Sequence, residues 1–195
     1  MAATPSTMLP LGTLIPSFRL PDLDGVMRSP EEFTDAPALL VAFICPHCPF
    51  ARHVRQGFSR FAKDYQERGL VVFGINSNDE RAFPEDGLEG MKEEATQAAY
   101  TFPYLRDESQ QVAQAFHAAC TPDLFLFNRD SQLVYRGQFD DSRPGNGKPV
   151  DGADLRAAVD AVLAGRPVPE PQKASIGCNI KWKPGNEPDY FRNKR

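Results

Sequence analysis

Two apolar runs and the segment between them dominate the hydrophobic pattern of the chain. Residues 38–44 and 70–75 are short, continuous and rich in Leu, Val, Ile and Phe, which is typical of strands buried on both faces of a sheet. Between them, apolar residues recur at helical spacing, namely Ala51, Val54, Phe58, Phe61, Ala62 and Tyr65. The pattern predicts a strand, an amphipathic helix ending near Gly69, and a second strand parallel to the first.

Further elements are predicted on both sides of this unit. They are a hairpin at 18–28, strands at 123–127 and 132–136, and helices at 88–98, 112–119 and 155–163. Asp24-Gly25 supplies the tight turn of the hairpin, and Asp107 with Gln110 resembles a capping box before the middle helix. Strands and helices that alternate in this order predict an α/β fold with a mixed sheet.

The chain changes character after residue 165. Three prolines between 167 and 171 exclude regular structure, and four apolar residues then alternate with polar ones. These four are Ile176, Cys178, Ile180 and Trp182. The alternation predicts an extended arm with one apolar face. We therefore divide the chain into a domain at 1–165 and an arm at 166–195, which packs on the domain or on a partner subunit; the second case would give a homodimer.

Composition narrows the class of protein. The chain has 195 residues, 41% of them hydrophobic and 25% charged, which is the balance of a globular protein with one well-buried core. A net charge of −4 gives no reason to expect nucleic acid or membrane partners. The first residues lack the pattern of a secretory signal, and no stretch approaches the roughly 20 apolar residues of a membrane span. We therefore expect a cytoplasmic protein, in which a close cysteine pair is more often catalytic or metal-binding than structural.

The candidate chemistry is a thiol pair in the segment Cys45-Pro46-His47-Cys48, which lies where the first strand ends and the helix begins. Backbone N–H groups and the helix dipole stabilise an anion at a helix N-terminus. If Cys45 holds the cap position and Pro46 the first helical position, the pKa of Cys45 falls below the ordinary cysteine value of about 8.5. Cys48 then lies one turn later on the same side, and His47 can add positive charge beside the sulfur.

Two other interpretations of the pair are weaker. A zinc site needs a second cysteine pair or suitably spaced histidines, whereas Cys120 and Cys178 each stand alone, so no metal is predicted. A structural disulfide between residues one turn apart constrains almost no chain and adds little stability. Thiol redox chemistry, which needs no other cofactor, is the prediction that remains. Cys120 and Cys178 are expected to pack as small core residues.

The order of elements, with Cys-x-x-Cys at the start of the first helix and Thr121-Pro122 before an antiparallel strand, resembles an enlarged thioredoxin fold. That fold is a three-layer α/β/α architecture with a central mixed sheet, and its proline at this position is cis and faces the thiols. The resemblance implies that Thr121 lies close to Cys45 and that its backbone is free to pair with an extended substrate. Several segments are also similar to peroxiredoxin-like proteins of the AhpC/TSA superfamily, namely 43–50, 76–79, 102–105, 120–123, 135–141 and 176–182. This similarity runs from about Leu14 to Pro188.

Two departures from these families affect the expected activity. Pro46-His47 separates the cysteines where thioredoxins have Gly-Pro, and the same dipeptide occurs in the disulfide oxidase DsbA, which implies a less reducing couple. Peroxiredoxins place a threonine three residues before their reactive cysteine, whereas this chain has Ala42. The missing hydroxyl argues against efficient peroxidase activity.

The sequence thus predicts a thiol-disulfide oxidoreductase. Cys45 is expected to attack a substrate disulfide, and Cys48 to resolve the mixed disulfide. The residues expected to contact the substrate are Pro46, His47, Thr121 and Pro122. Protein or small-molecule disulfides are the expected substrates, and a thioredoxin-type or low-molecular-weight thiol is the expected reductant. Two alternatives stay open: a thiol peroxidase, in which Cys48, Cys120 or Cys178 resolves a sulfenic acid at Cys45, and a non-catalytic binding module whose thiols are incidental.

Overall fold

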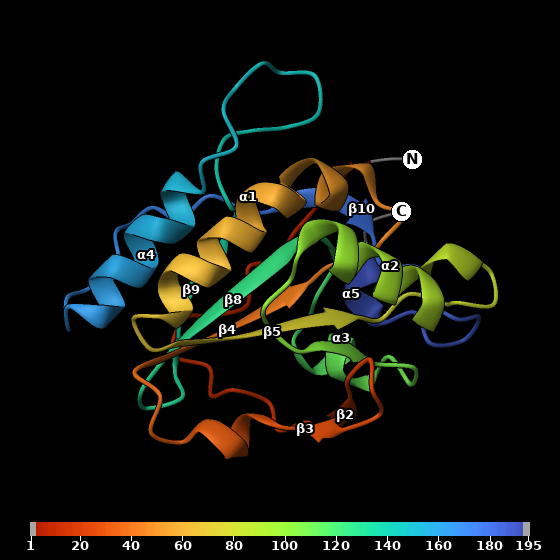
Figure 1. The fold of residues 1–195 in the computed structure, drawn as a ribbon, viewed down its shortest axis with the longest axis horizontal. Coiled ribbons are helices and arrows are strands. Elements are labelled where there is room, and N and C mark those ends of the chain that lie inside the picture. The colour runs from red at the N-terminus through yellow and green to blue at the C-terminus, as the bar shows by residue number, and fades with distance from the viewer. Residues whose placement is uncertain (1–2, 193–195) are drawn as a thin grey trace.

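A five-stranded mixed sheet forms the centre of the computed structural model, which describes residues 3–192 (Figure 1). Its strands, in spatial order, are β6 (Tyr104–Arg106), β5 (Leu70–Asn76), β4 (Ala38–Phe43), β8 (Asp123–Asn128) and β9 (Leu133–Gly137). The first three strands run parallel to one another. β8 is antiparallel to β4, and β9 is antiparallel to β8. The α/β class and the mixed sheet predicted from the hydrophobic pattern are confirmed.

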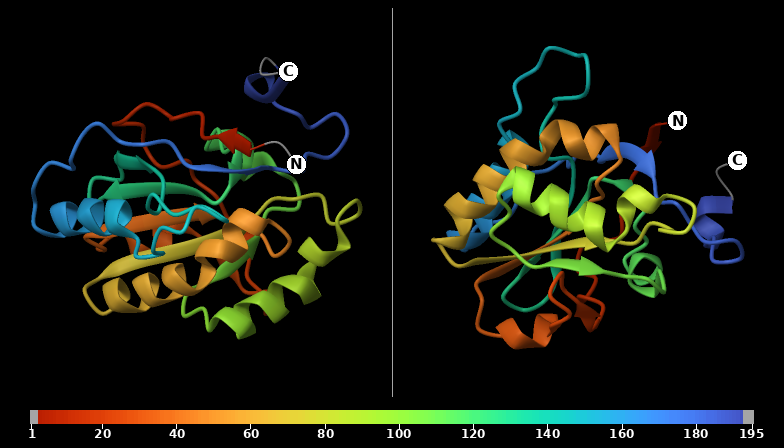
Figure 2. Two further views of the ribbon diagram at one scale, coloured as in Figure 1. Left: turned by 90° about the horizontal axis from the view of Figure 1, so that it is seen from above. Right: turned by 45° about the vertical axis from the view of Figure 1, so that its right-hand side comes forward.

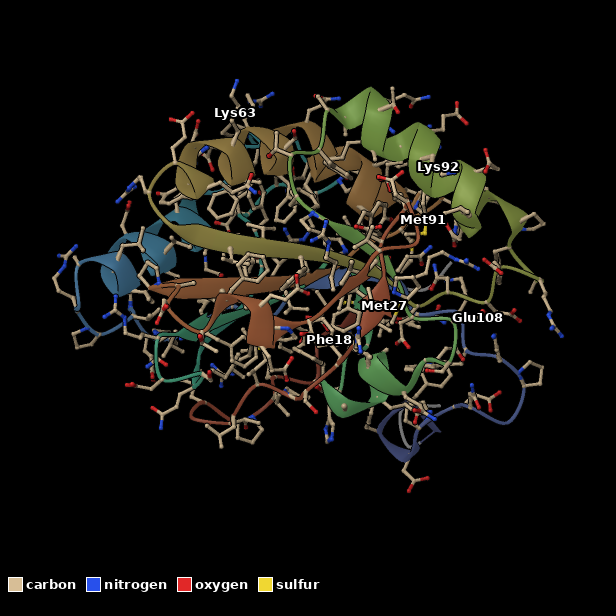
Figure 3. All side chains as sticks on the ribbon, turned by 60° about the horizontal axis from the view of Figure 1, so that its bottom comes forward. Phe18, Met27, Lys63, Met91, Lys92 and Glu108 are labelled. Carbon is tan, nitrogen blue, oxygen red and sulfur yellow. The ribbon has the colours of Figure 1, made fainter. Side chains whose placement is uncertain are left out.

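Helices cover both faces of this sheet, which gives the three layers of the expected fold (Figure 2). On one face lie α1 (Pro49–Gln66), α2 (Leu88–Ala98) and α4 (Ala153–Leu163); on the other lie α3 (Gln111–Ala115) and the N-terminal hairpin of β2 (Leu20–Pro21) and β3 (Met27–Arg28). Met91 of α2 belongs to the hydrophobic core on the first of these faces, and Phe18 belongs to the core on the opposite face (Figure 3). No helix among the described residues is both long and apolar enough to cross a membrane.

The start of α1 differs from the prediction in a way that matters for the thiols. The helix begins at Pro49, and Cys48 is its N-cap residue, whereas Cys45 and Pro46 precede the helix. Both Pro46 and Pro49 suit a first helical position, where the missing N–H costs nothing. The expectation that Cys45 caps the helix is therefore wrong by three residues, and Cys48 occupies that place.

The middle helix is also shorter than predicted. It ends at Ala115, because the backbone of His117 adopts a positive φ of 50° and leaves the helical path. The predicted capping box is absent: Gln110 is itself the N-cap residue, with a φ of 65°, and its side-chain amide donates to the carbonyl oxygens of Ser77 and Lys181. This side chain therefore fastens the C-terminal arm and does not cap a helix.

The arm crosses the domain as a strand. Its β10 (Ile176–Asn179) pairs antiparallel with β1 (Ala3–Pro5) on one side and with β7 (Cys120–Thr121) on the other. In this register Cys178 is opposite Thr121. The expectation that the Thr121 backbone is free for an extended substrate is wrong, because the chain's own arm already occupies that edge. A short helix, α5 (Asp189–Arg192), follows.

Residues on both sides of β10 hold the arm in place. The backbone N–H of Ile180 donates to the Ala119 carbonyl at 3.1 Å, and that of Lys181 donates to Asn78 Oδ1 at 2.8 Å. The Asp79 N–H in turn donates to the Lys181 carbonyl at 2.8 Å. Before the strand, the Ser6 N–H donates to the Ser175 carbonyl at 2.8 Å. The position of Cys178 is thus fixed from both directions.

Gly177 allows the arm to lie flush against the segment that precedes Pro122. A Cβ atom at this position would stand 1.9 Å from the Thr121 carbonyl oxygen and 2.6 Å from its carbonyl carbon. Both are backbone atoms, so no side-chain rotation can relieve the contact. A glycine is required here because of the close approach of two backbones.

We therefore expect Gly177→Ala to push β10 away from β7. The clash should lower the free energy of unfolding by about 1–3 kcal/mol, as overpacking does elsewhere, and should expose thiols that are buried in the native chain. Denaturant unfolding and native-state titration of thiols with an aromatic disulfide would measure the two effects.

Ile176→Ala is the matched control, because Ile176 belongs to the same strand and its side chain is 39% exposed. It should change the unfolding free energy by about 0.5 kcal/mol at most, as surface substitutions do, and leave the thiols protected. Equal behaviour of the two variants would contradict this account of Gly177.

Candidate active site

The predicted thiol pair lies at the junction of β4 and α1. Cys45 follows β4 by two residues, and Cys48 holds the N-cap of α1. Both side chains are free thiols and fully buried, with 0% of either residue exposed. Pro46 and His47, which connect them, are partly exposed. A substrate can therefore meet either sulfur only after a local movement of the covering chain.

Thr121 contacts both sulfur atoms. Its hydroxyl oxygen lies 3.3 Å from Cys45 Sγ, and its carbonyl oxygen accepts a hydrogen bond from the Cys48 thiol at 3.1 Å. The peptide bond between Thr121 and Pro122 is cis, as the resemblance implied. The fold thus brings this dipeptide to the thiol pair across more than 70 residues of sequence.

The two thiols titrate as a unit, and the anion falls on Cys48. The neighbouring Cys45 thiol has the largest effect on Cys48, and Thr121, Cys178 and the Ala51 N–H add to it; together they outweigh burial and lower the pKa of Cys48 to about 4. On ionisation the bond from Cys48 to the Thr121 carbonyl is lost, while these donors remain.

Cys45 behaves in the opposite way. Burial raises its pKa well above the ordinary cysteine value, and the bond to Cys48 and the negative charge of Asp86 add to the effect. The predicted lowering of the Cys45 pKa is therefore wrong. The physical argument behind it holds for the neighbouring cysteine, because the helix N-terminus is at Cys48.

His47 is fixed by a carboxylate that sequence reasoning did not single out. Its backbone N–H donates to Asp86 Oδ1 at 3.1 Å, its ring Nδ1 hydrogen-bonds the other Asp86 oxygen, and its ring stacks on Phe83 with centroids 5.1 Å apart. Asp86 is itself buried, and it is held by Asn78 Nδ2 and through its carbonyl by Asn76 Nδ2, both at 2.7 Å. The segment between the cysteines is thereby anchored to the edge of the sheet.

The same group of residues contains donors that a metal ion accepts. One atom each from Cys45, His47 and Asp86 lie within 4.8 Å of one another. Thiolate, imidazole and carboxylate are all zinc ligands, but a closed structural zinc site uses four of them. In this conformation the His47 and Asp86 atoms bond each other instead. Metal binding at these three residues would compete with disulfide chemistry at Cys45.

Cys178 is a third cysteine of the site. Together with Cys45, Cys48 and Ala51 it forms one buried cluster, and 2% of its surface is exposed. Burial, followed by its hydrogen bond to Cys48, raises the pKa of Cys178 to about 12. The alternation of apolar and polar residues along the arm predicted that Cys178 faces inward. It could not identify the residues that Cys178 contacts. Cys120, by contrast, lies outside this cluster.

A buried carboxyl group lies beside the site. Glu94 on α2 accepts hydrogen bonds from the hydroxyls of Tyr104 at 3.0 Å and Tyr100 at 3.4 Å, and burial raises its pKa to about 7. The residue also lines a cavity of about 1000 Å³ between α1 and α2, to which Pro46 and His47 contribute. Its protonation state therefore changes near neutral pH next to the thiol pair.

A carboxyl group with a raised folded-state pKa stabilises the fold at low pH and loses that contribution as pH rises through the folded pKa. We expect the unfolding free energy to fall by about 3 kcal/mol between pH 5 and pH 8 because of Glu94, given about 1.4 kcal/mol per pKa unit. Glu94→Gln should remove that fall.

The exposed neighbour Glu93 supplies the control, since Glu93→Gln should leave the pH dependence of the wild type in place. Denaturant unfolding at several pH values measures all three proteins. If Glu94→Gln kept the wild-type pH profile, the carboxyl would not be ionising in the way described.

Comparison of the sequence with known protein families identifies a matching family. The AhpC/TSA family model matches residues 11–136. A search of the curated proteins finds no match.

Two solved structures are similar over nearly the whole chain. A hypothetical protein from Sinorhizobium meliloti is 56% identical, with a TM-score of 0.92 over 93% of this chain and 100% of its own. An uncharacterized conserved protein from Geobacillus kaustophilus is 53% identical, with the same TM-score over 95% of this chain and 98% of its own. A secreted disulfide oxidoreductase from Mycobacterium tuberculosis is 14% identical, with a TM-score of 0.56 over 76% of this chain and 95% of its own, which shows the shared thioredoxin-like fold alone. The match of the family model over more than half of the sequence, together with this fold, shows that the chain belongs to the AhpC/TSA family.

Proposed function

We propose that the chain is a thiol-disulfide oxidoreductase whose redox couple is Cys45–Cys48. The observation that carries the proposal is a buried thiol pair at a helix N-terminus, whose two sulfurs both contact Thr121. The surroundings also lower the pKa of Cys48 to about 4. Disulfide exchange needs a thiolate to attack and a second thiol within bonding distance to release the product. A cytoplasmic location, with a thioredoxin-type or low-molecular-weight thiol as reductant, completes the proposal.

The electrostatics of the pair favour Cys48 as the attacking sulfur, which reverses the roles expected from the sequence. The Cys48 thiolate attacks one sulfur of a substrate disulfide; that bond breaks, a mixed disulfide forms, and one substrate thiolate leaves. Cys45 then gives its proton to the leaving group and attacks Cys48 Sγ. The Cys45–Cys48 bond forms, and the second substrate thiol is released. Two electrons pass from the pair to the substrate.

The packing of β10 favours small or flexible disulfides over folded proteins as substrates. An extended protein substrate would need the backbone edge of Thr121, which pairs with Cys178 and its neighbours in this structure. A small disulfide needs only a brief opening of the 46–47 segment or of the arm. Substrate access is then limited by local opening, and rates should depend on the stability of the arm.

A thiol peroxidase is the second candidate, and one observation favours it. Position 42 lacks the hydroxyl of peroxiredoxins, but the Thr121 hydroxyl lies 3.3 Å from Cys45 Sγ and can contact a peroxide there. Consumption of hydrogen peroxide with a thioredoxin-type donor distinguishes this activity from disulfide exchange. We expect the peroxide rate to be the smaller of the two.

Replacing Cys48 should abolish turnover. Cys48→Ser is expected to lower the rate of reduction of a small aromatic disulfide at least about 100-fold, because it removes the attacking thiolate, whereas Cys45→Ser removes the nearest resolving thiol and should lower the rate by a smaller factor. Cys120→Ser, which lies outside the cluster, should retain wild-type turnover. Wild-type turnover in the Cys48 variant would reject the proposed role.

The pH dependence of alkylation tests which sulfur is ionised. Because the pKa of Cys48 is about 4, its thiolate persists above that pH, and the rate constant for alkylation by iodoacetamide should stay nearly constant from pH 8 to pH 5 and fall below pH 4. For a thiol with an ordinary pKa, the rate constant for alkylation falls about tenfold for each unit of pH lowered across the same range. Peptide mapping identifies the alkylated residue.

If the label appears on Cys45, or if the rate falls throughout the range from pH 8 to pH 5, the assignment of the thiolate to Cys48 is wrong. The second outcome would favour a binding module in which the thiols have no redox role.

A further inference from the structure

Cys178 reaches the thiol pair from a different part of the chain than either of its members. Cys45 and Cys48 come directly before α1, whereas Cys178 lies on β10, in register with Thr121. Thr121 already contacts Cys45 and Cys48. The three cysteines consequently share one buried cluster, in which Phe50 packs against them from the surface side.

Cys48 is the central sulfur of this cluster. The buried cluster brings Cys45 and Cys178 against Cys48, and interactions with both thiols lower the pKa of Cys48. The anchoring bonds of the arm, at Ser175 before Cys178 and at Ile180 after it, keep this contact in place. A sulfur with one thiol on each side can be joined to either.

We propose that Cys178 is a third redox thiol of the site, which exchanges with the Cys45–Cys48 disulfide to form a Cys48–Cys178 disulfide. The inference rests on the proposed function, since that function supplies the first disulfide. It gives the C-terminal arm a chemical role in addition to its packing.

The exchange is balanced without any further oxidant. Once the Cys45–Cys48 bond exists, Cys178 loses its proton and attacks Cys48 Sγ. The Cys48–Cys178 bond forms as the Cys45–Cys48 bond breaks, and Cys45 leaves as thiolate and takes up the proton that Cys178 released. The number of thiols and the oxidation state of the protein stay the same. The disulfide has moved from the short segment 45–48 before α1 to a link between the N-cap of α1 and the arm.

This movement has two consequences for the site. It holds the oxidised state between two buried residues on elements far apart in sequence, with the arm covalently closed over Cys48. It also restores Cys45 as a thiol. An external reductant then has to open the arm before the pair can be regenerated, so reduction is slower than for a simple Cys-x-x-Cys couple.

Disulfide mapping in a Cys45→Ser variant tests the proposal directly. The full chain is treated with oxidised glutathione, free thiols are alkylated, and peptides are identified by mass spectrometry. Glutathione first couples to Cys48, and Cys178 then displaces it. The expected product is a peptide pair linked through Cys48 and Cys178, with no glutathione retained and two molecules of reduced glutathione released.

The controls separate Cys178 from other thiols. Cys45→Ser combined with Cys178→Ser should keep one glutathione on Cys48, and Cys45→Ser combined with Cys120→Ser should behave as Cys45→Ser alone. Cys120 is the appropriate comparison because it is a buried cysteine on the neighbouring strand β7, outside the cluster. A persistent glutathione adduct in the Cys45→Ser variant overturns the inference.

Oxidation of the wild-type protein distinguishes the failure of this inference from failure of the proposed function. Both the Cys45–Cys48 and the Cys48–Cys178 linkages are expected there. The first linkage alone, with the adduct persisting in the variant, would overturn only the role of Cys178. Neither linkage nor an adduct at Cys48 would overturn both.

Unfolding supplies a measurement that does not depend on peptide recovery. A bond from residue 48 to residue 178 closes a long loop and restricts the unfolded chain far more than one between residues 45 and 48. Oxidised Cys45→Ser should therefore unfold at a higher denaturant concentration than its reduced form. The double variant lacking Cys178 should show no such shift, and an equal shift in both proteins would contradict the proposed bond.

Discussion

The pairing of β10 with β7 is the constraint on which the environment of the thiols depends. This pairing sets Cys178 opposite Thr121, and Gly177 lets the two backbones approach closely. It buries Cys48 and places a third thiol against it. With the arm in place, the site is a closed cluster of sulfur atoms, and its chemistry depends on local opening.

The pKa values of the two cysteines shift in opposite directions. Burial dominates at Cys45, and stabilisation of the charged form dominates at Cys48, the N-cap residue of α1. Desolvation raises the pKa of Cys45, and the bond to Cys48 and the negative charge of Asp86 add to this effect, whereas the Thr121 hydroxyl acts in the opposite direction. Cys48 is equally inaccessible to solvent, yet Cys45, Thr121 and Cys178 together outweigh burial and lower its pKa. Hydrogen bonds to the charged form therefore decide which sulfur ionises. The difference between the two cysteines comes from three residues of displacement relative to the helix start.

Much of the fold could be predicted from the sequence because it depends on local periodicity. The apolar runs gave β4 and β5 within a residue, and the spacing of Ala51 to Tyr65 gave the buried face of α1. Boundaries were less certain. Two prolines near the start of α1 fit its first position equally well, and the apolar residues after Ala115 continue a helical pattern that the backbone abandons at His117. The conformational preferences of nearby residues do not decide where these helices begin or end; packing against the rest of the chain does.

The parts of the site that the sequence did not reveal are contacts between distant residues. Asp86 stands in an ordinary polar loop, and its role follows only from Asn76 and Asn78 holding it beside His47. Cys178 had a visible signal, since it occupies the apolar side of an alternating arm, but a small apolar residue at that position satisfies the same pattern.

The register of β10 decides whether Cys178 can reach the other thiols. A shift of one residue would turn the Cys178 side chain to the opposite face of the strand. In that register the sulfur would lose Cys48, and Gly177 would no longer meet the Thr121 carbonyl. The glycine and the cysteine therefore depend on one another: the first permits the approach that the second uses. Packing alone requires glycine at 177, because a Cβ atom there would clash with the Thr121 carbonyl, but at 178 it requires only a small apolar residue. The feature that packing does not require is the thiol itself, which the register places in one buried cluster with Cys45 and Cys48, where the proposed exchange would use it.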